Sequence, residues 1–326
     1  MTTSAEPVLL RAPGPGLGVN GVGPGDGTRA VALGGGHGVA RTLAALPSVV
    51  DHVTAIVTVA DDGGSSGRLR RDLDVLPPGD LRMALTTMSS HRELAEIIGY
   101  RFGRGELAGH SLGNLVLVAL QDLSDGDIVT ALDRLAALLG VPGRVLPCTT
   151  QAVTLLAATP DGDVTGQDAV AATPRLERVW LEPADAVGTP DAVAAIERAD
   201  LIVLGPGSIY TSLLPNLLVP DIGAAVIAAR APVVFVANLR EQPGETEGMS
   251  LVDHLDAMTA HVPALTVDVV VAHDGPRPTG GGEPLRLDHA ALGHRVGRVV
   301  SADLLDGADG HAPAALGRIF DRLLRH

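Results

Sequence analysis

Residues 53–71 have the sequence VTAIVTVADDGGSSGRLRR, and this stretch decides the fold. It opens with an apolar, β-branched run over residues 53–59, which is typical of a strand buried on both faces of a parallel sheet. The run ends at two carboxylates, Asp61 and Asp62, and a glycine–serine loop over residues 63–67 follows. Glycines let a backbone turn its N–H groups toward one point, and such a concavity binds anions, phosphate above all. The stretch therefore predicts a strand end that carries an active site.

Serines and arginines complete this strand end. Arg68, Arg70 and Arg71 supply the forked cationic donors that suit phosphate. We expect a helix to begin next to Arg68, which would place Arg68 in its first turn. The alternative is a flexible glycine loop closed by surface ion pairs. The predicted site residues of this stretch are Asp61, Asp62, Gly63, Gly64, Ser65, Ser66 and Arg68.

The composition favours an α/β protein with an aliphatic core. The chain has 326 residues, enough for one large domain or two small ones, and it is 46% hydrophobic but only 2% aromatic. The formal net charge of −14 argues against a nucleic-acid-binding surface, which would be basic. The sequence contains arginine but no lysine, which excludes a Schiff-base lysine and the lysine of a phosphate-binding loop.

The single cysteine and the short apolar runs indicate a cytoplasmic protein. Cys148 excludes an intrachain disulfide and a cysteine-based zinc site, and its apolar surroundings favour a place in the core over a nucleophilic role. No apolar run is long enough to span a bilayer. Residues 1–27 lack signal-peptide features and are rich in glycine and proline, so we expect a disordered tail followed by one domain over residues 28–326.

A second glycine loop follows the first predicted strand, residues 29–33, and precedes a helical pattern over residues 39–46. Helix N-termini attract phosphate through free N–H groups and the helix dipole. The dinucleotide fingerprint G-x-G-x-x-G/A fails at its third place, which is Val39 or Arg41 depending on the first glycine. The loop therefore predicts a nucleotide-like ligand, with a tight packing turn as the alternative. Its predicted site residues are Gly34, Gly35, Gly36, His37 and Gly38.

Two further motifs bring polar side chains to helix starts. A helix is expected from about Asp80 to Met88, so Asp80 and Arg82 either line the site or act as a cap and a surface charge. His110 and Asn114 lie four apart ahead of an apolar helix, so one helical face could present both. For His110 the functional and the structural roles stay equally open.

The second half of the chain repeats the strand–glycine–helix pattern. The predicted strands 201–204 and 233–239 both end in polar loops, whose predicted site residues are Gly205, Gly207, Ser208, Tyr210, Thr211, Asn216 and Asn238. Tyr210 could stack on a base or a sugar, or belong to the core. Ligands of open α/β sheets bind outside the carboxyl ends of the strands, so we expect the loops after residues 33, 60, 204 and 239 to converge.

The segment between these halves is more broken. Residues 144–182 contain three short strand patterns and the hairpin signal Asp161-Gly162. We therefore expect a small lobe, inserted between parts of the main sheet over about residues 76–185. A last helix is predicted near residues 312–325.

In their order, the motifs resemble those of the YvcK-like gluconeogenesis factors, relatives of the CofD 2-phospho-L-lactate transferases. The resemblance covers residues 29–326 and implies an α/β fold, a Rossmann-like three-layer α/β/α core with a mostly parallel central sheet. The segments that carry it are GGGHGVARTLAAL at residues 34–46, DDGGSSGRLR at 61–70, PPGDLR at 77–82, GHSLGNL at 109–115, LGPGSIYTSLLPNLL at 204–218 and QPGET at 242–246.

The resemblance also implies a function. YvcK-like proteins bind UDP-sugars, chiefly UDP-N-acetylglucosamine, and influence carbon use, cell-wall precursor supply and cell shape. CofD-like proteins transfer a phospho-lactyl type group to a deazaflavin alcohol with a divalent metal. We expect regulatory UDP-sugar binding without catalysis, with metal-assisted transfer as the alternative and a dinucleotide-dependent oxidoreductase as a weaker third. A homo-oligomer is left open.

If the protein is an enzyme, Asp61 and Asp62 are its candidate catalytic carboxylates. They could hold Mg²⁺, which needs few carboxylates when phosphate oxygens complete its shell. They could as well accept hydrogen bonds from a ribose and from the backbone.

Two departures from the family pattern fall where a wall of the site is expected. The loop usually written NLMTQPGET reads NLREQPGET at residues 238–246, so Arg240 and Glu241 add a charge of each sign. Residues 279–284, TGGGEP, lack the tyrosine that YvcK-like chains often carry there. We expect both departures to change the contacts with a sugar nucleotide.

Overall fold

The computed structural model describes residues 27–293, 295–307 and 310–325. The tail expected over residues 1–27 lies outside the described residues except for Gly27.

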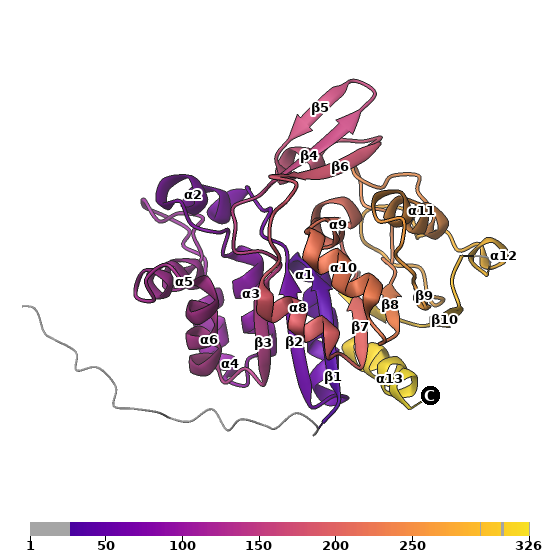
Figure 1. The fold of residues 1–326 in the computed structure, drawn as a ribbon, viewed down its shortest axis with the longest axis horizontal. Coiled ribbons are helices and arrows are strands. Elements are labelled where there is room, and N and C mark those ends of the chain that lie inside the picture. Colours follow the sequence, from indigo (N-terminus) through magenta and orange to yellow (C-terminus); the bar gives the residue numbers. More distant parts are fainter. Residues whose placement is uncertain (1–26, 294, 308–309, 326) are drawn as a thin grey trace, which may run out of the picture.

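A parallel seven-stranded sheet forms the centre of the molecule (Figure 1). Its order is β10-β9-β8-β7-β1-β2-β3, and every neighbouring pair is parallel. The expected α/β fold with a mostly parallel sheet is therefore confirmed. The strands are β1 (Arg29–Gly34), β2 (His52–Val57), β3 (Gly143–Pro147), β7 (Leu201–Leu204), β8 (Val233–Val236), β9 (Val269–His273) and β10 (Arg298–Ala302).

The strand order reverses at β1, and this reversal positions the site. The chain builds outward from β1 through β2 to β3, then returns to the other side of β1 with β7 and continues to β10. Leu33 of β1 therefore lies between Ile56 of β2 and Leu204 of β7. Such a switch point leaves a crevice at the carboxyl ends of the strands, where ligands bind in open α/β sheets.

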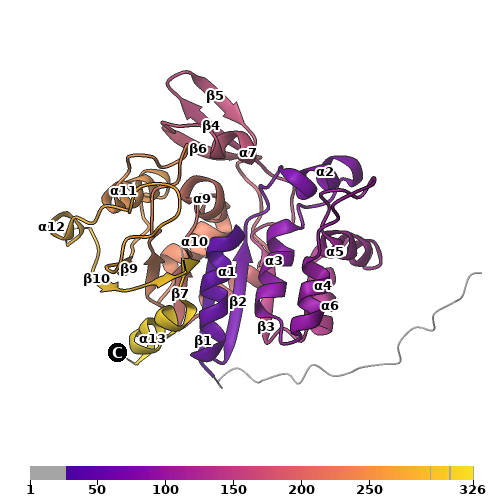
Figure 2. The ribbon, with the colours of Figure 1, turned by 180° about the vertical axis from the view of Figure 1, so that it is seen from behind.

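Helices cover both faces of the sheet and give the molecule three layers. Figures 1 and 2 show α8 and α10 on one face and α1, α3 and α13 on the other. The helices are α1 (Gly36–Ala45), α2 (Gly64–Leu73), α3 (Gly79–Met88), α4 (Arg92–Gly99), α5 (Leu112–Asp122), α6 (Ile128–Leu139), α7 (Gln167–Ala171), α8 (Pro190–Glu197), α9 (Leu214–Leu217), α10 (Pro220–Ala228), α11 (Leu251–His261), α12 (His289–Leu292) and α13 (Pro313–Leu324). A 3₁₀ turn (Leu46–Ser48) follows α1, a π-helical turn (Ile209–Leu213) leads into α9, and a short antiparallel pair, β11 (Leu305–Asp306) and β12 (Gly310–His311), precedes α13.

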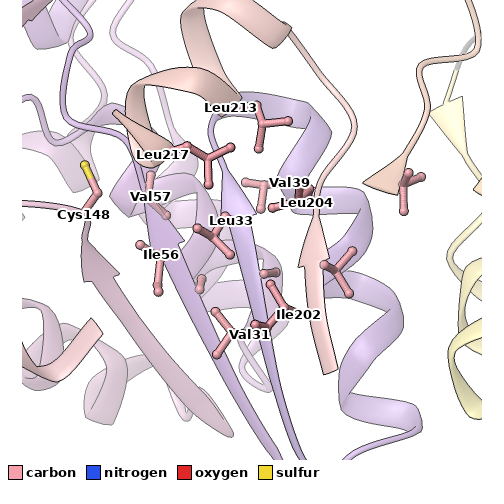
Figure 3. Packing of buried hydrophobic residues seen from close by; sticks show 14 of the residues in the cluster. Val31, Leu33, Val39, Ile56, Val57, Cys148, Ile202, Leu204, Leu213 and Leu217 are labelled. Carbon is pink, nitrogen blue, oxygen red and sulfur yellow. The ribbon is translucent and has the colours of Figure 1, made fainter. Parts of the chain in front are cut away.

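The core is aliphatic, as the composition predicts. Val31, Leu33 and Ile56 on the central strands are at most 1% exposed, and Figure 3 shows them packed beneath the turn that carries Leu213 and Leu217. Cys148 lies in the same core, and burial raises the pKa of its thiol to about 12. The structural role predicted for Cys148 is thus confirmed, because a thiol with that pKa stays protonated at neutral pH.

A second, three-stranded antiparallel sheet stands above the carboxyl ends of the central strands (Figure 1). It consists of β4 (Thr154–Thr159), β5 (Gly162–Thr165) and β6 (Arg178–Glu182), and the predicted hairpin turn at Asp161-Gly162 joins β4 to β5. This sheet is shorter than the lobe expected over residues 76–185. The difference arises because β3 pairs in parallel with β2 and because α3 and α6 pack beside them, which joins these elements to the main body.

Most predicted helices are present, but the start of α2 was predicted wrongly. The helix begins at Gly64, so Arg68 lies in its second turn rather than its first. The extended backbone of Gly63 precedes it, and the serines that looked like loop residues form the first turn. Within the described residues, no single helix has the length and apolar character to cross a membrane; the segments Ile209–Leu217 and Pro220–Ala228 meet that test only as a pair bent by 80°.

Candidate functional site

A cleft of about 670 Å³ opens beside α1 at the carboxyl ends of β1, β7 and β8, and we call it the glycine cleft. It brings together three of the loops that the sequence predicts to converge, those after residues 33, 204 and 239. Its lining comprises His37, Gly38, Ala40, Arg41, Ala44, Thr87, Pro206, Gly207, Asn238, Leu239, Arg240, Glu241, Gln242, Pro243, Gly281, Gly310 and His311.

Glycine is required where α1 meets the loop after β7. A Cβ at Gly38 would lie 1.8 Å from the carbonyl oxygen of Pro206, so only glycine allows this approach. Gly207 has φ of +129°, a conformation that L side chains rarely adopt. The two glycine turns therefore pack backbone against backbone and form the inner wall of the glycine cleft.

Asn238 links the end of β8 to the same loop. Its Oδ1 accepts a hydrogen bond from the Gly207 N–H at 2.6 Å, and its Nδ2 donates to the Gly207 carbonyl at 2.8 Å. The predicted site residue Asn238 thus fixes the Gly207 backbone while its own side chain lines the cleft.

Ser208 and Thr211, both predicted site residues, contact a carboxylate of the protein itself. Glu245 is buried, accepts a hydrogen bond from the Ser208 hydroxyl, and also accepts one from the Tyr210 N–H at 2.9 Å. Ser208 in turn accepts a hydrogen bond from the Thr211 N–H at 2.8 Å. Burial raises the pKa of Glu245, although the hydrogen bonds from Ser208 and from the backbone counteract this. Glu245 therefore holds the QPGET loop against the turn that follows β7.

Tyr210 and Asn216 point into the protein rather than into the cleft. The Tyr210 side chain is buried in the main hydrophobic cluster and meets the His261 ring edge-on, with 6.0 Å between ring centroids. The Nδ2 of Asn216 donates to the carbonyls of Gly34 and Ser212, at 3.1 and 2.8 Å. Of the two roles weighed for Tyr210, the structure therefore favours the core.

The outer part of the glycine cleft carries two arginines, Arg41 and Arg240. His37 is exposed at the start of α1, and Arg41, one turn further on, pairs with Asp306 at 3.1 Å. Arg240 donates a hydrogen bond to the Gly281 carbonyl, so this arginine packs on the glycine loop of residues 279–284. His311 is buried beside the cleft, donates to the Ala237 carbonyl, and burial lowers its pKa to about 4. Its ring is therefore neutral at pH 7.

A second group of polar side chains lies at the end of β2, and we call Ser65, Arg82, His110 and Asn114 the α2 network. All four are at least 91% buried. The Arg82 Nε donates to Asn114 Oδ1 at 3.2 Å, which orients the amide so that Nδ2 donates to Ser65 Oγ at 3.0 Å. Since Ser65 Oγ accepts that bond, its own hydrogen is available to His110 Nδ1, 3.0 Å away. Burial and the nearby Arg68 lower the pKa of His110, which favours this neutral acceptor form.

The expectation that one helical face presents both His110 and Asn114 is wrong. Helix α5 begins at Leu112, so His110 lies in the preceding loop and shares no helical face with Asn114. Both side chains nevertheless reach Ser65, one from each side.

The two neighbouring carboxylates Asp61 and Asp62 have different surroundings. Asp61 Oδ1 accepts from the Gly63 N–H at 3.0 Å, and burial raises its pKa. Asp62 Oδ1 accepts from the Asp168 N–H at 2.9 Å, which ties this strand end to α7. Asp80 lies near Asp61 and Gly35; burial, with the Asp61 charge second, raises the Asp80 pKa to about 6.

Asp61 therefore has carboxylates on several sides: the charges of Asp168 and Asp62 raise its pKa, and its own charge raises that of Asp80. Among the described residues, no three His, Cys, Asp or Glu side chains form a group that could hold a metal ion. Mg²⁺ nevertheless needs only one or two carboxylates when phosphate oxygens supply other ligands. Among the described residues, Asp61 has Asp80 and Asp62 as carboxylate neighbours that could share such an ion with it.

Sequence reasoning missed four residues of these two regions. Arg41 had a usable signal, because it lies four residues after His37 in the quoted glycine motif and so shares its helix face. Glu245 lies in the quoted QPGET motif, yet its partner Ser208 is 37 residues away. Asp168 and His311 stand outside every quoted motif, and local pattern offers no signal for them.

Three comparisons place the chain among known proteins. Residues 30–305 match the model of the family described as 2-phospho-L-lactate transferase CofD. A putative gluconeogenesis factor of Mycobacterium tuberculosis strain H37Rv is 49% identical over 256 residues, covering 74% of this chain and 75% of that protein. A gluconeogenesis factor of Listeria monocytogenes is 38% identical over 305 residues, covering 91% and 94%. The crystal structure of a UPF0052 family member from Bacillus halodurans matches with a TM-score of 0.85 at 36% identity, covering 90% of this chain and 98% of that one.

Proposed function

Since the chain belongs to the CofD family and, within it, to the gluconeogenesis factors, we propose that it is a regulatory protein whose glycine cleft binds a UDP-sugar. UDP-N-acetylglucosamine or a near relative is the proposed ligand. The observation that carries the proposal is the convergence of three strand-end loops on one cleft of about 670 Å³, within the roughly 300–1,000 Å³ of small-molecule sites.

The chemistry of the cleft suits a nucleoside diphosphate. The N-terminus of α1 has no acidic residue in its own first turn, and its N–H groups and dipole favour an anion, as the hydrogen bond from the Gly36 N–H to the Asp80 carboxylate illustrates. Arg41 and Arg240 would add guanidinium groups for the diphosphate. The carbonyl and amide groups around Asn238 and Gln242 would offer hydrogen bonds to a base or a sugar.

The proposed biological role follows from the same family. A protein that senses a UDP-sugar would link central carbon metabolism to the supply of cell-wall precursors, and so to cell shape, in the cytoplasm. Such a sensor needs ligand binding without turnover, and Mg²⁺ would assist only by screening the diphosphate.

Calorimetric titration with UDP-N-acetylglucosamine, UDP-glucose, UDP and NAD tests the proposal. We expect saturable binding of the UDP compounds and none of NAD. Arg41→Gln should lower the affinity about tenfold or more, the loss expected for one charge-assisted contact. Arg144→Gln is a matched control, because Arg144 is 42% exposed and ion-paired, as Arg41 is at 43%, but lies outside the cleft. The absence of binding to any UDP-sugar would refute the proposal.

A second candidate function is a CofD-like transfer of a phospho-lactyl type group from a nucleoside diphosphate donor. Asp61 and Asp80 favour it, because two partly buried carboxylates, one after β2 and one in the first turn of α3, are suited to an Mg²⁺ ion. The ion would neutralise charge on the leaving phosphate oxygens. Product formation from such a donor and a deazaflavin alcohol, lost on chelation, would establish the transferase; ligand binding without turnover would leave the regulator.

A further inference from the structure

An apolar groove of about 360 Å³ lies at the end of α4, and we call it the α4 groove. Its lining is Glu93, Glu96, Ile97, Tyr100 and Leu112, none of which lines the glycine cleft. Ile97 is 49% exposed and Tyr100 is 56% exposed, so two large apolar side chains face solvent next to each other. Single exposed apolar residues are ordinary, whereas adjacent ones around a groove mark an interaction site.

Backbone hydrogen bonds hold the groove in shape. The Leu112 N–H donates to the Tyr100 carbonyl at 2.8 Å, and the Phe102 N–H donates to the His110 carbonyl at 2.9 Å. The Tyr100 ring meets the Phe102 ring edge-on, with 5.3 Å between centroids. A groove that is already formed loses little conformational freedom when a ligand binds, so most of the contact energy is available for binding.

The rim of the groove is acidic. Glu93 and Glu96 lie three residues apart on α4 and therefore share one face of the helix. Both are exposed, and neither has an ion-pair partner in the part of the chain that the structure describes. The groove thus suits a short apolar segment that carries a cation at one end.

The first 26 residues contain one such segment. Val8, Leu9 and Leu10 form the only run of three aliphatic residues there, and Arg11, which follows them, is the only basic residue. Residues 1–11 contain no glycine, whereas residues 12–27 contain seven glycines and three prolines, a composition typical of linkers. The sequence pattern is therefore that of a binding segment followed by a spacer.

We propose that residues 8–11 of the chain bind in the α4 groove of the same molecule, with the aliphatic side chains on Ile97 and Tyr100 and Arg11 at the acidic rim. The spacer is long enough, because its 16 residues reach roughly 50 Å when extended. Helix α4 packs on α3, and α3 packs on β2, the neighbour of β1. Packed helices lie only about 8–10 Å apart, so the groove is within reach of Gly27, which precedes β1.

The size of the groove favours a tethered occupant over a separate protein. A stable complex of two proteins buries about 1,200–2,000 Å², far more than a groove lined by five residues provides. A segment on a short linker instead meets its site at an effective concentration in the millimolar range, so a few side chains suffice. The inference does not rest on the proposed UDP-sugar binding.

Limited digestion with trypsin tests the inference on the full chain. The chain has no lysine, so Arg11–Ala12 is the only bond before Arg29 that trypsin recognises. Mass spectrometry follows the initial loss of residues 1–11, and a synthetic peptide of residues 5–17 gives the rate for the free segment. We expect the wild-type protein to be cleaved about tenfold more slowly than the peptide.

Variants of the groove identify where the segment binds. Ile97→Gln should raise the cleavage rate to nearly that of the peptide. Glu96→Gln should raise it less, and this increase should disappear at high salt. The controls are Ile227→Gln on α10, where the side chain is 42% exposed, and Glu197→Gln at the exposed end of α8; both should leave the rate unchanged.

Three results would overturn the inference. Wild-type cleavage as fast as that of the peptide would show that the segment is not bound. Slow cleavage that is the same in Ile97→Gln as in the wild type would show that the segment binds elsewhere. Cleavage that becomes faster on dilution would show that the groove takes the segment of a second copy. Calorimetry with UDP-sugars bears on none of these rates, so the proposed function and this inference fail independently.

Discussion

The glycine cleft and the α2 network lie at neighbouring strand ends of one sheet, yet backbone forms the wall of the first and side chains form the second. The cleft is walled by backbone at Gly38 and Gly207 and carries exposed or half-exposed cations at its mouth. The network consists of buried side chains that bond to one another. Open polar groups are free to bind a ligand, whereas satisfied buried groups mainly hold elements in place. The difference teaches that the cleft is the part suited to a ligand, whereas the network joins α2, α3 and α5 through Ser65, Arg82 and Asn114.

The largest effect is expected where the cleft depends on glycine. Gly38→Ala would place a Cβ 1.8 Å from the Pro206 carbonyl oxygen, so α1 must move away from the turn after β7. We expect a loss of about 3 kcal/mol in the free energy of unfolding and no detectable UDP-sugar binding. Urea denaturation and calorimetry measure the two. Gly103→Ala is the control, because its Cβ would meet no atom within 4 Å. A Gly38→Ala protein with normal stability and affinity would show that the close approach is dispensable.

The second effect concerns the buried acid that closes the cleft's inner wall. Glu245→Gln removes the charge of a carboxylate whose Oε1 accepts hydrogen bonds from both the Ser208 hydroxyl and the Tyr210 N–H, and it replaces Oε2 with an amide donor. We expect a loss of about 2 kcal/mol in stability, typical of charge-assisted hydrogen bonds, and faster proteolysis within residues 241–248. Glu247→Gln, at an exposed position in the same loop, should change neither. Equal stability of both variants would show that Glu245 does not hold the inner wall of the cleft in place.

How much of these two regions the sequence could predict depends on the range of the interactions. The buried strands were predictable because their apolar runs are local, and the switch point followed from the alternation of strands, glycine turns and helices. The start of α2 was not, because Gly-Ser runs resemble loops when no neighbouring element is known. The lobe was drawn too large because nothing in Gly143–Pro147 reveals β2 as its partner.

The site shows the same limit in its side chains. Glycines of the cleft were recognisable because their backbone role is local. The bond of Glu245 to Ser208 spans 37 residues and that of Asp62 to Asp168 spans 106, so no local pattern could reveal either. The proximity of Asp61 to Asp80 likewise appears only once α3 packs against β2 and α1.

The third effect concerns Asp80, and it tests whether the ionised carboxylate destabilises or stabilises the folded protein. Its pKa in the folded protein is about 6, above the 3.8 of a free carboxyl, so the folded state holds the proton more tightly between these values. Wild-type stability should therefore fall as the pH rises from about 4 to about 6, and Asp80→Asn should escape that fall. We compare the free energy of unfolding of Asp80→Asn with that of the wild type. This difference should be about 1.5 kcal/mol more in favour of the variant above pH 7 than at pH 3. This is about half of what a two-unit shift represents, because the half-buried carboxyl is partly screened.

Urea denaturation at several pH values from 3 to 8 measures this difference. Asp185→Asn, at an exposed position, should give a curve parallel to the wild type. A constant offset between Asp80→Asn and the wild type across the whole range would show that Asp80 titrates as an ordinary surface acid. A gain in stability combined with lost Mg²⁺-dependent binding would mark Asp80 as a functional acid kept at a cost to folding.

The smallest effect on stability is expected at Asp62, which follows β2. The result tests whether the end of β2 binds a ligand or only contacts α7. Asp62 accepts one hydrogen bond, from the Asp168 N–H, and Asn at this position keeps an acceptor oxygen for it. The change removes a charge beside Asp61, whose pKa Asp62 helps to raise, so a lost charge-assisted bond and a relieved repulsion oppose each other. We therefore expect Asp62→Asn to alter the free energy of unfolding by less than about 1 kcal/mol.

UDP-sugar affinity, measured with and without Mg²⁺, tests the functional role of this carboxylate. If a ligand or metal uses it, the loss in binding free energy should be well above the change in the free energy of unfolding. Asp163→Asn on β5 serves as the control, being exposed on the same lobe that Asp62 contacts. A variant that loses stability yet binds the UDP-sugar normally would make Asp62 a tie between β2 and α7, and would leave ligand binding to the glycine cleft.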